Sequence, residues 1–273
     1  MMSGFTRFAL VIFVLAWGQL LQARVIVVSD LDDTVRIANS KNKADALKRL
    51  LLGVKPFPVM QRIFQEIDQE KDQTPFIYVS ASYYLIYNAE KWLDEFAFPA
   101  GDAIQRRLGQ DRDKFEYKVG RIVDFLVSVE MSREDTVWFF GDNFELDPDV
   151  YLEVAKRLEI EDHHIYIRDV EAEATEFTSY LPVKKLPGVT YFFSEYELVG
   201  REEFSSLSRE VHRRLQRQRE EGSLIPDFVQ DYLYKRVKKA LCDKDANALV
   251  DFFCSIRARN ETGTLIQNYL DRF

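Results

Sequence analysis

The fold of this chain is decided by VIVVSDLDDT, residues Val25–Thr34. The apolar half, residues 25–28, predicts a buried parallel strand because branched apolar residues follow one another without interruption. Three carboxylates, those of Asp30, Asp32 and Asp33, follow at the carboxyl end of this strand. Like charges this close raise one another's pKa unless a cation or a phosphate shares the site, and open α/β sheets bind ligands outside the strand ends. The stretch therefore predicts a Mg²⁺-assisted phosphoryl-transfer site; the alternative is an acidic loop that caps a following helix.

Length and composition describe a chain that folds around a sizeable core. It has 273 residues, 47% of them hydrophobic and 14% aromatic, which excludes disorder and suits one large α/β domain or a domain with an appendage. The net charge of −8 argues against a nucleic-acid binder, because polyanions need a basic surface, although it leaves room for a local basic pocket.

The N-terminus resembles a targeting segment. Arg7 precedes an apolar run, residues 8–17, and a small-x-small cleavage site at residues 16–18 predicts a signal peptide over residues 1–18. A second, poorer site would extend the signal to residue 23. Export to the periplasm or the medium is expected; an uncleaved membrane anchor or a buried helix that continues into the first strand are the alternatives.

Cysteine usage leaves two interpretations open. The chain has two cysteines, Cys242 and Cys254, and both lie far from the acidic stretch. Export would permit a disulfide between them. Two buried free thiols on helices fit the pattern equally well.

Strands and helices alternate along residues 24–194, which predicts an α/β domain with a doubly wound, mostly parallel sheet and helices on both faces. The predicted strands are 25–28, 76–79, 137–140, 164–167 and 189–193, and the predicted helices are 44–52, 58–70, 82–96, 114–129 and 148–158. From residue 195 the pattern is helical throughout, which predicts a C-terminal helical appendage, residues 195–273, packed on the sheet domain. Its predicted helices are 201–221, 226–241, 246–259 and 263–270.

Two polar motifs follow the second predicted strand. Ser80 and Ser82 come directly after it, where a hydroxyl can hydrogen-bond a phosphoryl oxygen, although either serine could be an ordinary helix N-cap. Lys118 lies early in the 114–129 helix, where a lysine by itself is typical of a surface. Gly120 costs about 1 kcal/mol in a helix interior, so we expect a close approach of another group there.

A second acidic motif, GDNFELDP, occupies residues 141–148 after the third predicted strand. Gly141 permits a tight exit from the strand, Asp142 lies at the strand end, and Asp147 comes one loop later. Carboxylates from two separate loops suit Mg²⁺, which takes a few oxygen ligands and keeps waters. For Asp147 the alternative is the N-cap of the following helix.

The order of these motifs resembles that of the haloacid dehalogenase superfamily of phosphohydrolases. Over residues 24–170 the chain also resembles the catalytic domain of the actin-patch-type phosphatidate phosphatases. The stretches that carry this resemblance are VSDLDDTV (28–35), FIYVSAS (76–82), KVGRI (118–122), GDNFE (141–145), DPDVY (147–151) and IYIRDV (165–170). The resemblance implies the haloacid dehalogenase-like fold and a Mg²⁺-dependent phosphomonoesterase.

The resemblance also implies catalytic roles. Asp30 would be the nucleophile that forms an aspartyl-phosphate. Asp32 would protonate the leaving oxygen and then activate water. Ser80 and Lys118 would bind the phosphoryl oxygens, and Asp33 would be structural.

A metal site follows from the same resemblance. Asp30, the main-chain carbonyl of Asp32 and Asp142 would hold Mg²⁺, with Asp147 or Glu145 in the outer shell. Family members usually have Ser-Gly at residues 143–144 and a histidine at position 117, where this chain has Asn-Phe and a tyrosine. Arg168 and Asp169 are either structural or help to orient the site.

The spacing of the motifs bears on the substrate. The intervals 34–80 and 80–118 are too short for a large cap domain, so an open site is expected, with residues 36–49 as a small lid. An open site suits phosphatidate or another lipid phosphate; soluble or protein phosphate esters, and a non-catalytic secreted effector, are the alternatives. The basic run 212–219 could contact anionic lipid peripherally, although flanking acidic residues favour a solvated helix face.

Overall fold

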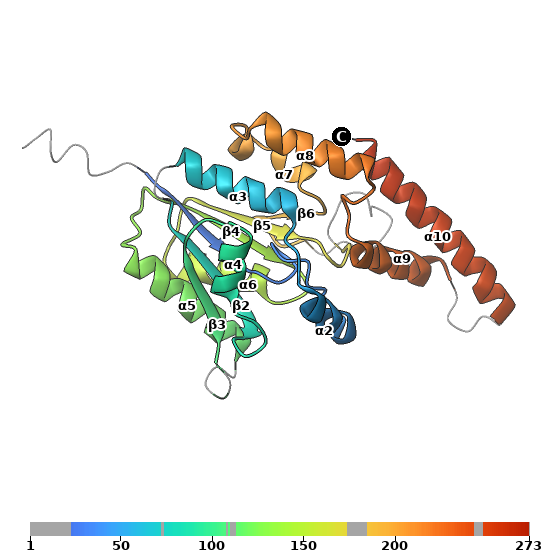
Figure 1. Ribbon diagram of the computed structural model, residues 1–273, viewed down its shortest axis with the longest axis horizontal. Helices are drawn as coiled ribbons and strands as arrows, with labels where there is room; N and C mark the ends of the chain where they lie inside the picture. The colour runs from blue at the N-terminus through green and yellow to red at the C-terminus, as the bar shows by residue number, and fades with distance from the viewer. Residues whose placement is uncertain are drawn as a thin grey trace, which may run out of the picture.

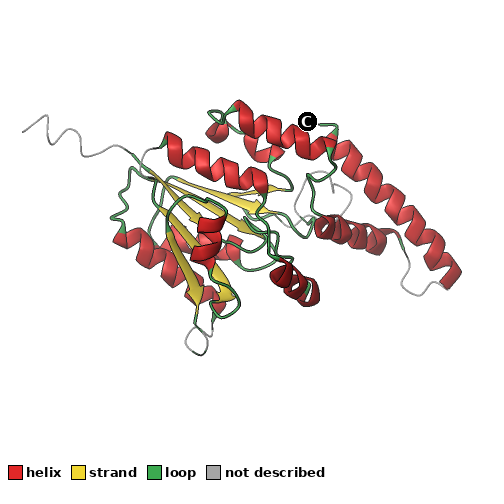
Figure 2. Ribbon diagram, in the orientation of Figure 1, coloured by secondary structure: helices red, strands yellow, loops and turns green. Residues whose placement is uncertain are grey.

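The computed structural model describes residues 23–71, 74–107, 109, 113–173, 185–242 and 248–272. The predicted signal segment, residues 1–18, lies outside these ranges. The described residues form one six-stranded parallel sheet with the strand order β3-β2-β1-β4-β5-β6 and with helices on both faces (Figures 1 and 2), which confirms the predicted fold class. The strands are β1 (Val25–Ser29), β2 (Phe76–Tyr83), β3 (Asp102–Arg106), β4 (Thr136–Asp142), β5 (His163–Arg168) and β6 (Val189–Phe192).

β1 lies in the middle of the sheet, which explains its unbroken apolar sequence. It pairs with β2 along one edge and with β4 along the other. Ile26, Val27 and Val28 are fully buried because both faces of the strand are covered. The chain changes sides of β1 between β3 and β4, and such a switch point leaves a crevice at the carboxyl end of the strand.

Each face of the sheet has its own apolar core, because alternate side chains of a strand point to opposite faces. One core contains Val27 and the inner sides of α3 (Pro58–Glu70), α4 (Ala89–Glu95) and α8 (Arg209–Glu220). The other contains Ile26 and Val28 with the inner sides of α5 (Lys114–Ser128) and α6 (Asp147–Arg157). The sheet is thereby fixed from both sides, and its loops at the strand ends rest on rigid elements.

The second strand differs from the prediction. β2 runs to Tyr83 because its last residues pair with β3, so the helix expected from residue 82 is wrong there. The helix begins only at Ala89, where the side chain of Asn88 accepts a cap hydrogen bond. β3 is absent from the prediction because DAIQR is a partly exposed edge strand without a clear apolar alternation.

The chain after β6 is helical, as predicted, but its helices are divided differently. The described helices are α7 (Tyr196–Val199), a short 3-10 helix (Glu202–Phe204), α8, α9 (Asp227–Leu241) and α10 (Ala248–Leu270). α10 is continuous through Gly263, where two helices are predicted. α8 packs on α3 and contributes to the apolar core on that face of the sheet, whereas α9 and α10 pack on one another. The domain division at residue 195 stays a prediction.

A disulfide joins Cys242, after α9, to Cys254 of α10, which decides between the two interpretations of the cysteines. It ties the C-terminal end of α9 to the N-terminal part of α10. Among the described residues, no helix combines the length and the apolar character that a membrane crossing requires.

Candidate active site

Four charged side chains that the sequence predicts as site residues meet at the carboxyl ends of β1 and β4. Asp30 follows β1, Asp142 ends β4, Asp147 begins α6 and Lys118 lies in α5. Lys118 Nζ lies 2.7 Å from Asp30 Oδ1 and 2.5 Å from Asp147 Oδ1. The backbone N–H of Asp142 donates to Asp147 Oδ2 over 3.3 Å. All four residues are buried, and together they form the closed half of the site.

Gly141 makes the closed half possible. A Cβ at this position would lie 2.6 Å from Cβ and 2.7 Å from Oδ2 of Asp147, so a side chain there would push α6 away from β4. The alternative role of Asp147 as an N-cap is wrong, because α6 begins with Asp147 itself and Leu146 occupies the cap position. The expectation for Gly120 is also wrong, since nothing in the described part of the chain lies within 4 Å of a Cβ there.

Burial sets the electrostatics of the closed half. It raises the pKa of Asp30 and of Asp142 well above the usual range, opposed in Asp30 by Lys118 and reinforced in Asp142 by Asp147 and Asp30. Burial alone would lower the pKa of Lys118, but Asp147 and Asp30 outweigh it and raise that pKa well above its usual range. Three buried carboxylates therefore share one ammonium group, and the closed half is short of positive charge.

The closed half fits a hard divalent cation. One carboxylate oxygen from each of Asp30, Asp142 and Asp147 lies within 4.8 Å of the others. Oxygen donors of this kind are the ligands that Mg²⁺ prefers. A cation would also supply the positive charge that a buried acidic cluster needs.

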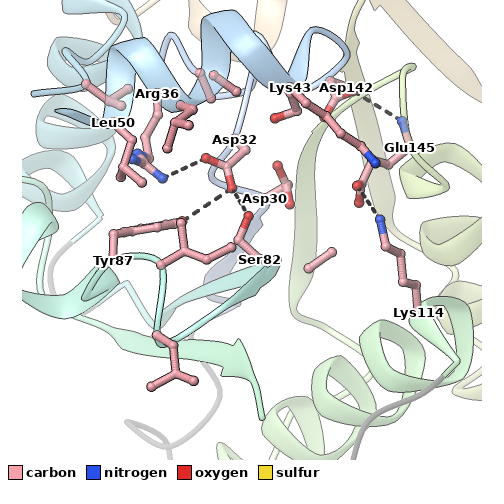
Figure 3. A pocket seen from close by; sticks show the side chains of 18 residues that line it. Asp30, Asp32, Arg36, Lys43, Leu50, Ser82, Tyr87, Lys114, Asp142 and Glu145 are labelled. Carbon is pink, nitrogen blue, oxygen red and sulfur yellow. Dashed lines mark hydrogen bonds and ion pairs between the residues drawn. The ribbon is translucent and has the colours of Figure 1, made fainter. Parts of the chain in front are cut away.

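Asp32 lies on the other side of the site, among donors from several segments. Arg36 Nη1 donates to Asp32 Oδ1 over 2.7 Å, and Ser82 Oγ donates to Oδ2 over 2.8 Å. The hydroxyls of Ser80 and Tyr87 are 3.2 and 3.4 Å from Oδ2. Figure 3 shows Arg36, Ser82 and Tyr87 converging on Asp32. These three residues and Asp32 all line the cavity described below, and they form the open half of the site.

The two serines after β2 take different places. Ser80 is fully buried; its hydroxyl accepts a hydrogen bond from the backbone N–H of Ser82 and donates to Asp32. Ser82 lines the cavity. The N-cap alternative is wrong for both, because β2 continues through Tyr83. The sequence predicts Ser80 as the phosphate-binding hydroxyl, whereas of the two serines it is Ser82 that lines the cavity.

Asp33 holds the loop that follows β1. Its backbone has a left-handed φ of 62°, and its carboxylate accepts hydrogen bonds from the backbone N–H groups of Asn39 (2.6 Å) and Ser40 (2.7 Å). Burial raises the pKa of Asp33 to about 6. These contacts are structural, as the sequence analysis expects.

A cavity of about 500 Å³ opens in front of both halves. It lies between α2 (Lys43–Leu52) and the loop after β2 (Figure 3), so α2 stands where the sequence predicts a small lid. One end of the cavity is acidic, with Asp30, Asp32 and Asp142. Its walls are apolar and are formed by Ala38, Ala46, Leu47, Leu50, Val54, Leu85 and Ile86.

Two lysines in this cavity are absent from the sequence-based site. Lys43 comes from α2 and Lys114 from α5, where Lys114 Nζ lies 2.7 Å from Glu145 Oε1. Lys114 precedes Lys118 by four residues, a spacing that places both on one face of a helix and could have indicated it. Lys43 carries no such signal, because the position of α2 over the cavity is set by tertiary structure.

Two of the residues that depart from the family pattern, Asn143 and Tyr117, have structural roles. Asn143 donates from Nδ2 to Asp169 Oδ1 over 2.6 Å and accepts from the backbone N–H of Val170 over 3.0 Å, so it joins the loops after β4 and β5. Tyr117 is buried in the core under α5. Neither departure brings a new side chain into the described lining of the cavity.

Arg168 is a structural residue beneath the site. Its Nη2 donates to Glu195 Oε1 over 2.8 Å and to the carbonyl oxygen of Thr34 over 3.2 Å. Its guanidinium stacks 3.7 Å from the ring centroid of Phe57. Arg168 therefore supports the loop after β1 from below, which is the structural one of the two roles that the sequence leaves open.

A protein-family model described as "Phosphatidate phosphatase APP1, catalytic domain" matches residues 25–169. Curated proteins include no significant match. Among solved structures, the chain is similar to one of a Pnkp1/Rnl/Hen1 complex, with 14% identity over 52% of this chain and 45% of that chain and a TM-score of 0.36. It is also similar to a class C acid phosphatase from Bacillus anthracis with tungstate bound, with 15% identity over 55% and 69% of the two chains and a TM-score of 0.32. The chain thus spans less than half the length of the first of these two chains.

The matched residues contain the whole predicted motif set, from Asp30 through Ser80 and Lys118 to Asp142 and Asp147. They also contain β1 to β5 and both halves of the site. Since this match covers more than half of the chain, the chain belongs to the family of the phosphatidate phosphatase APP1 catalytic domain, in the haloacid dehalogenase superfamily.

Proposed function

We propose that the chain is a Mg²⁺-dependent phosphatase that forms an aspartyl-phosphate on Asp30 and acts on a lipid phosphate such as phosphatidate. The observation that carries the proposal is that Asp30 and Asp32 face one cavity in opposite surroundings. Asp30 lies against the buried ammonium group of Lys118, whereas Asp32 lies among the hydroxyls and the guanidinium of the open half. A nucleophile and a proton carrier need such different surroundings.

The reaction has two steps. A carboxylate oxygen of Asp30 bonds to phosphorus while the bond from phosphorus to the leaving alcohol breaks, and Asp32 gives its proton to that alcohol. Asp32 then takes a proton from a water molecule that attacks the aspartyl-phosphate, which releases inorganic phosphate and restores Asp30. Lys118, Ser80 and Ser82 hydrogen-bond the phosphoryl oxygens.

Haloacid dehalogenase-like phosphatases generally use a divalent metal, and the acidic cluster suits Mg²⁺. Asp30, the main-chain carbonyl of Asp32 and Asp142 would hold the ion, with Asp147 and Glu145 beside it. When bound, it would neutralise charge on the phosphoryl group and hold Asp30 in its ionised form.

The shape of the cavity supports a lipid phosphate over a soluble ester. The acidic end and the two lysines suit a phosphate headgroup with its metal, while the walls from α2 and the loop after β2 are apolar. A soluble sugar phosphate or nucleotide would leave these walls without partners, at a cost of roughly 25 cal/mol for each Å² of apolar surface left in water.

The test compares phosphate release from phosphatidate in detergent micelles with release from glycerol phosphate and p-nitrophenyl phosphate. We expect Mg²⁺ to be required and phosphatidate to be preferred, and Asp30→Asn to lower turnover by roughly 10⁴-fold or more. Wild-type turnover by Asp30→Asn would contradict the aspartyl-phosphate. A preference for the soluble esters would contradict the lipid substrate and leave the chemistry intact.

We also propose that the protein is exported. The disulfide between Cys242 and Cys254 supports this, because disulfides persist in oxidising compartments. Mature protein beginning at residue 19 or 24 is expected from N-terminal sequencing, and an intact N-terminus would contradict cleavage.

A further inference from the structure

The mouth of the cavity carries exposed apolar side chains on both sides. On α2, Leu47 is 57% exposed and the neighbouring Leu51 is 78% exposed, and on the opposite loop Leu85 is also 78% exposed. Leu47 and Leu85 line the cavity as well, so the exposed surface is continuous with its walls. The full set, the apolar rim, consists of Leu47, Leu51, Leu52, Tyr84, Leu85 and Ile86; Leu47, Leu85 and Ile86 line the cavity, and the other three are exposed neighbours on the same helix and loop.

Both sides of this rim expose apolar residues where helices and turns of soluble proteins usually do not. None of the residues described in α2 is buried, although short amphipathic helices are stabilised mainly by packing their apolar face. The loop places three consecutive apolar residues, 84–86, in a turn, where polar residues are usual. Exposed apolar patches rimmed by polar residues mark surfaces that bind a partner or a membrane.

The charge around the rim identifies the partner. Residues 41–55 contain five basic side chains, Lys41, Lys43, Lys48, Arg49 and Lys55, against the single acidic Asp45, in a chain whose net charge is −8. Lys41 pairs with Glu171 and Arg49 with Asp45, so the positive charge that the described ion pairs leave in place is that of Lys43, Lys48 and Lys55. Such a concentration of positive charge beside apolar residues matches an anionic lipid surface, where basic residues meet headgroups and apolar ones enter the acyl boundary.

We propose that the apolar rim docks this protein on the surface of an anionic bilayer. α2 and residues 84–86 enter the interface, and the mouth of the cavity then opens directly onto the lipid. The sequence suggests a different surface, the basic run on α8, but the two apolar residues of that helix, Val211 and Leu215, are buried, so α8 has no apolar side chain to enter the acyl boundary. The docking proposal rests on the proposed function in one respect: the bilayer is expected to contain the substrate of the phosphatase.

Sedimentation of the full protein with vesicles tests the proposal. Equimolar phosphatidylcholine and phosphatidylglycerol provide an anionic surface without a phosphomonoester, so docking is measured apart from turnover. We expect binding that weakens with salt and is much lower on pure phosphatidylcholine. The variant Leu51→Gln/Leu52→Gln is expected to lower the partition coefficient by at least about tenfold, because each leucine loses part of its transfer free energy.

Val127→Gln is the matched control. Val127, like Leu51, is the second-to-last residue of its helix and exposed, at 63%, but it lies about 20 Å along α5 from Lys114. Vesicle binding by this control and by Arg213→Gln/Arg217→Gln should equal that of the wild type. All variants should keep the wild-type unfolding midpoint and turnover of p-nitrophenyl phosphate, since none of these side chains lines the described cavity.

Three outcomes would overturn the docking proposal: no binding by the wild type, full binding by Leu51→Gln/Leu52→Gln, or loss of binding with the α8 variant instead. Each of them leaves the phosphatase proposal standing if phosphate is still released. Conversely, rim-dependent binding by a protein that releases no phosphate would support docking and contradict the proposed function.

Discussion

The closed and open halves of the site stabilise their carboxylates with different partners. In the closed half, Asp30 and Asp147 are held by a buried lysine, at distances of 2.7 and 2.5 Å, and burial dominates their pKa values. In the open half, Asp32 is held by a guanidinium and by hydroxyls at the edge of the cavity.

The two halves therefore differ in what their carboxylates can do: those of the closed half hold the fold together, and the one of the open half can exchange a proton. A carboxylate that is fully buried depends on its partners for folding as well as for chemistry, because an unpaired buried charge is costly. A carboxylate at a cavity wall can lose or gain a proton and pass its hydrogen bonds to a substrate. Substitutions in the closed half should therefore affect stability and activity together, and substitutions in the open half mainly activity.

The largest effect is expected from Lys118→Met, which removes the cation of the closed half. It should lower the free energy of unfolding by about 3–5 kcal/mol, since carboxylates at Asp30 and Asp147 are left buried without compensation. Urea denaturation measures this loss, and phosphate release should fall with it. The control is Lys114→Met, whose exposed ion pair with Glu145 is worth about 1 kcal/mol or less. Equal losses in the two variants would contradict the distinction between the halves.

Asp32→Asn should separate activity from stability. We expect phosphatidate turnover to fall by about 10²–10⁴-fold because the general acid is lost. The urea midpoint should fall less than in Lys118→Met, because asparagine keeps an oxygen acceptor for the buried guanidinium of Arg36. The loss of turnover should be smaller for p-nitrophenyl phosphate, whose leaving group needs no proton. A uniform loss on both substrates would mean that Asp32 does not protonate the leaving oxygen.

Mg²⁺ should stabilise the protein through the closed half. At a hundredfold excess over its Kd, the ion should add about 2.7 kcal/mol to the free energy of unfolding, measurable as a rise in Tm. Asp142→Asn should abolish the rise, whereas Asp149→Asn, an exposed change in the first turn of α6, should retain it. An undiminished rise in Asp142→Asn would place the ion elsewhere.

The smallest effects are expected from two glycines, and they have opposite signs. Gly141→Ala should destabilise by about 1–3 kcal/mol, because its methyl group overlaps Asp147. Gly120→Ala should stabilise by up to about 1 kcal/mol, because the site is open and alanine favours the helix. Thermal unfolding distinguishes them, and destabilisation by Gly120→Ala would contradict the open surroundings of that residue.

The sequence predicts those parts of the fold in which the local residue pattern alone determines the structure. The apolar run of β1 predicts a central strand, and the acids after it predict the site, because a strand of this composition has few other places in a parallel sheet. Asp142 and Lys118 are predicted because the order of motifs resembles that of the haloacid dehalogenase phosphohydrolases, which places Asp142 at the end of a strand and Lys118 in the helix before it.

The rest depends on tertiary contacts. β3 is a strand because it pairs with the end of β2, although its own sequence, DAIQR, shows little pattern. The sequence predicts a close approach at Gly120, but the close approach occurs at Gly141, where Asp147 of α6 lies against the end of β4. The apolar rim is also invisible to periodicity, because the leucines of α2 form an ordinary amphipathic pattern whose exposure depends on where the helix lies.

The central position of β1 has a consequence for biosynthesis. The strand is among the first parts of the sheet to be made, yet one of its two neighbours, β4, comes more than a hundred residues later. Lys118, the partner of Asp30, follows it by 88 residues. Until then an emerging chain carries an apolar strand with an open edge and a carboxylate without its counter-charge. The first strand of the sheet to emerge is therefore among the last to be completed, and it is the part that a chaperone would have to shield.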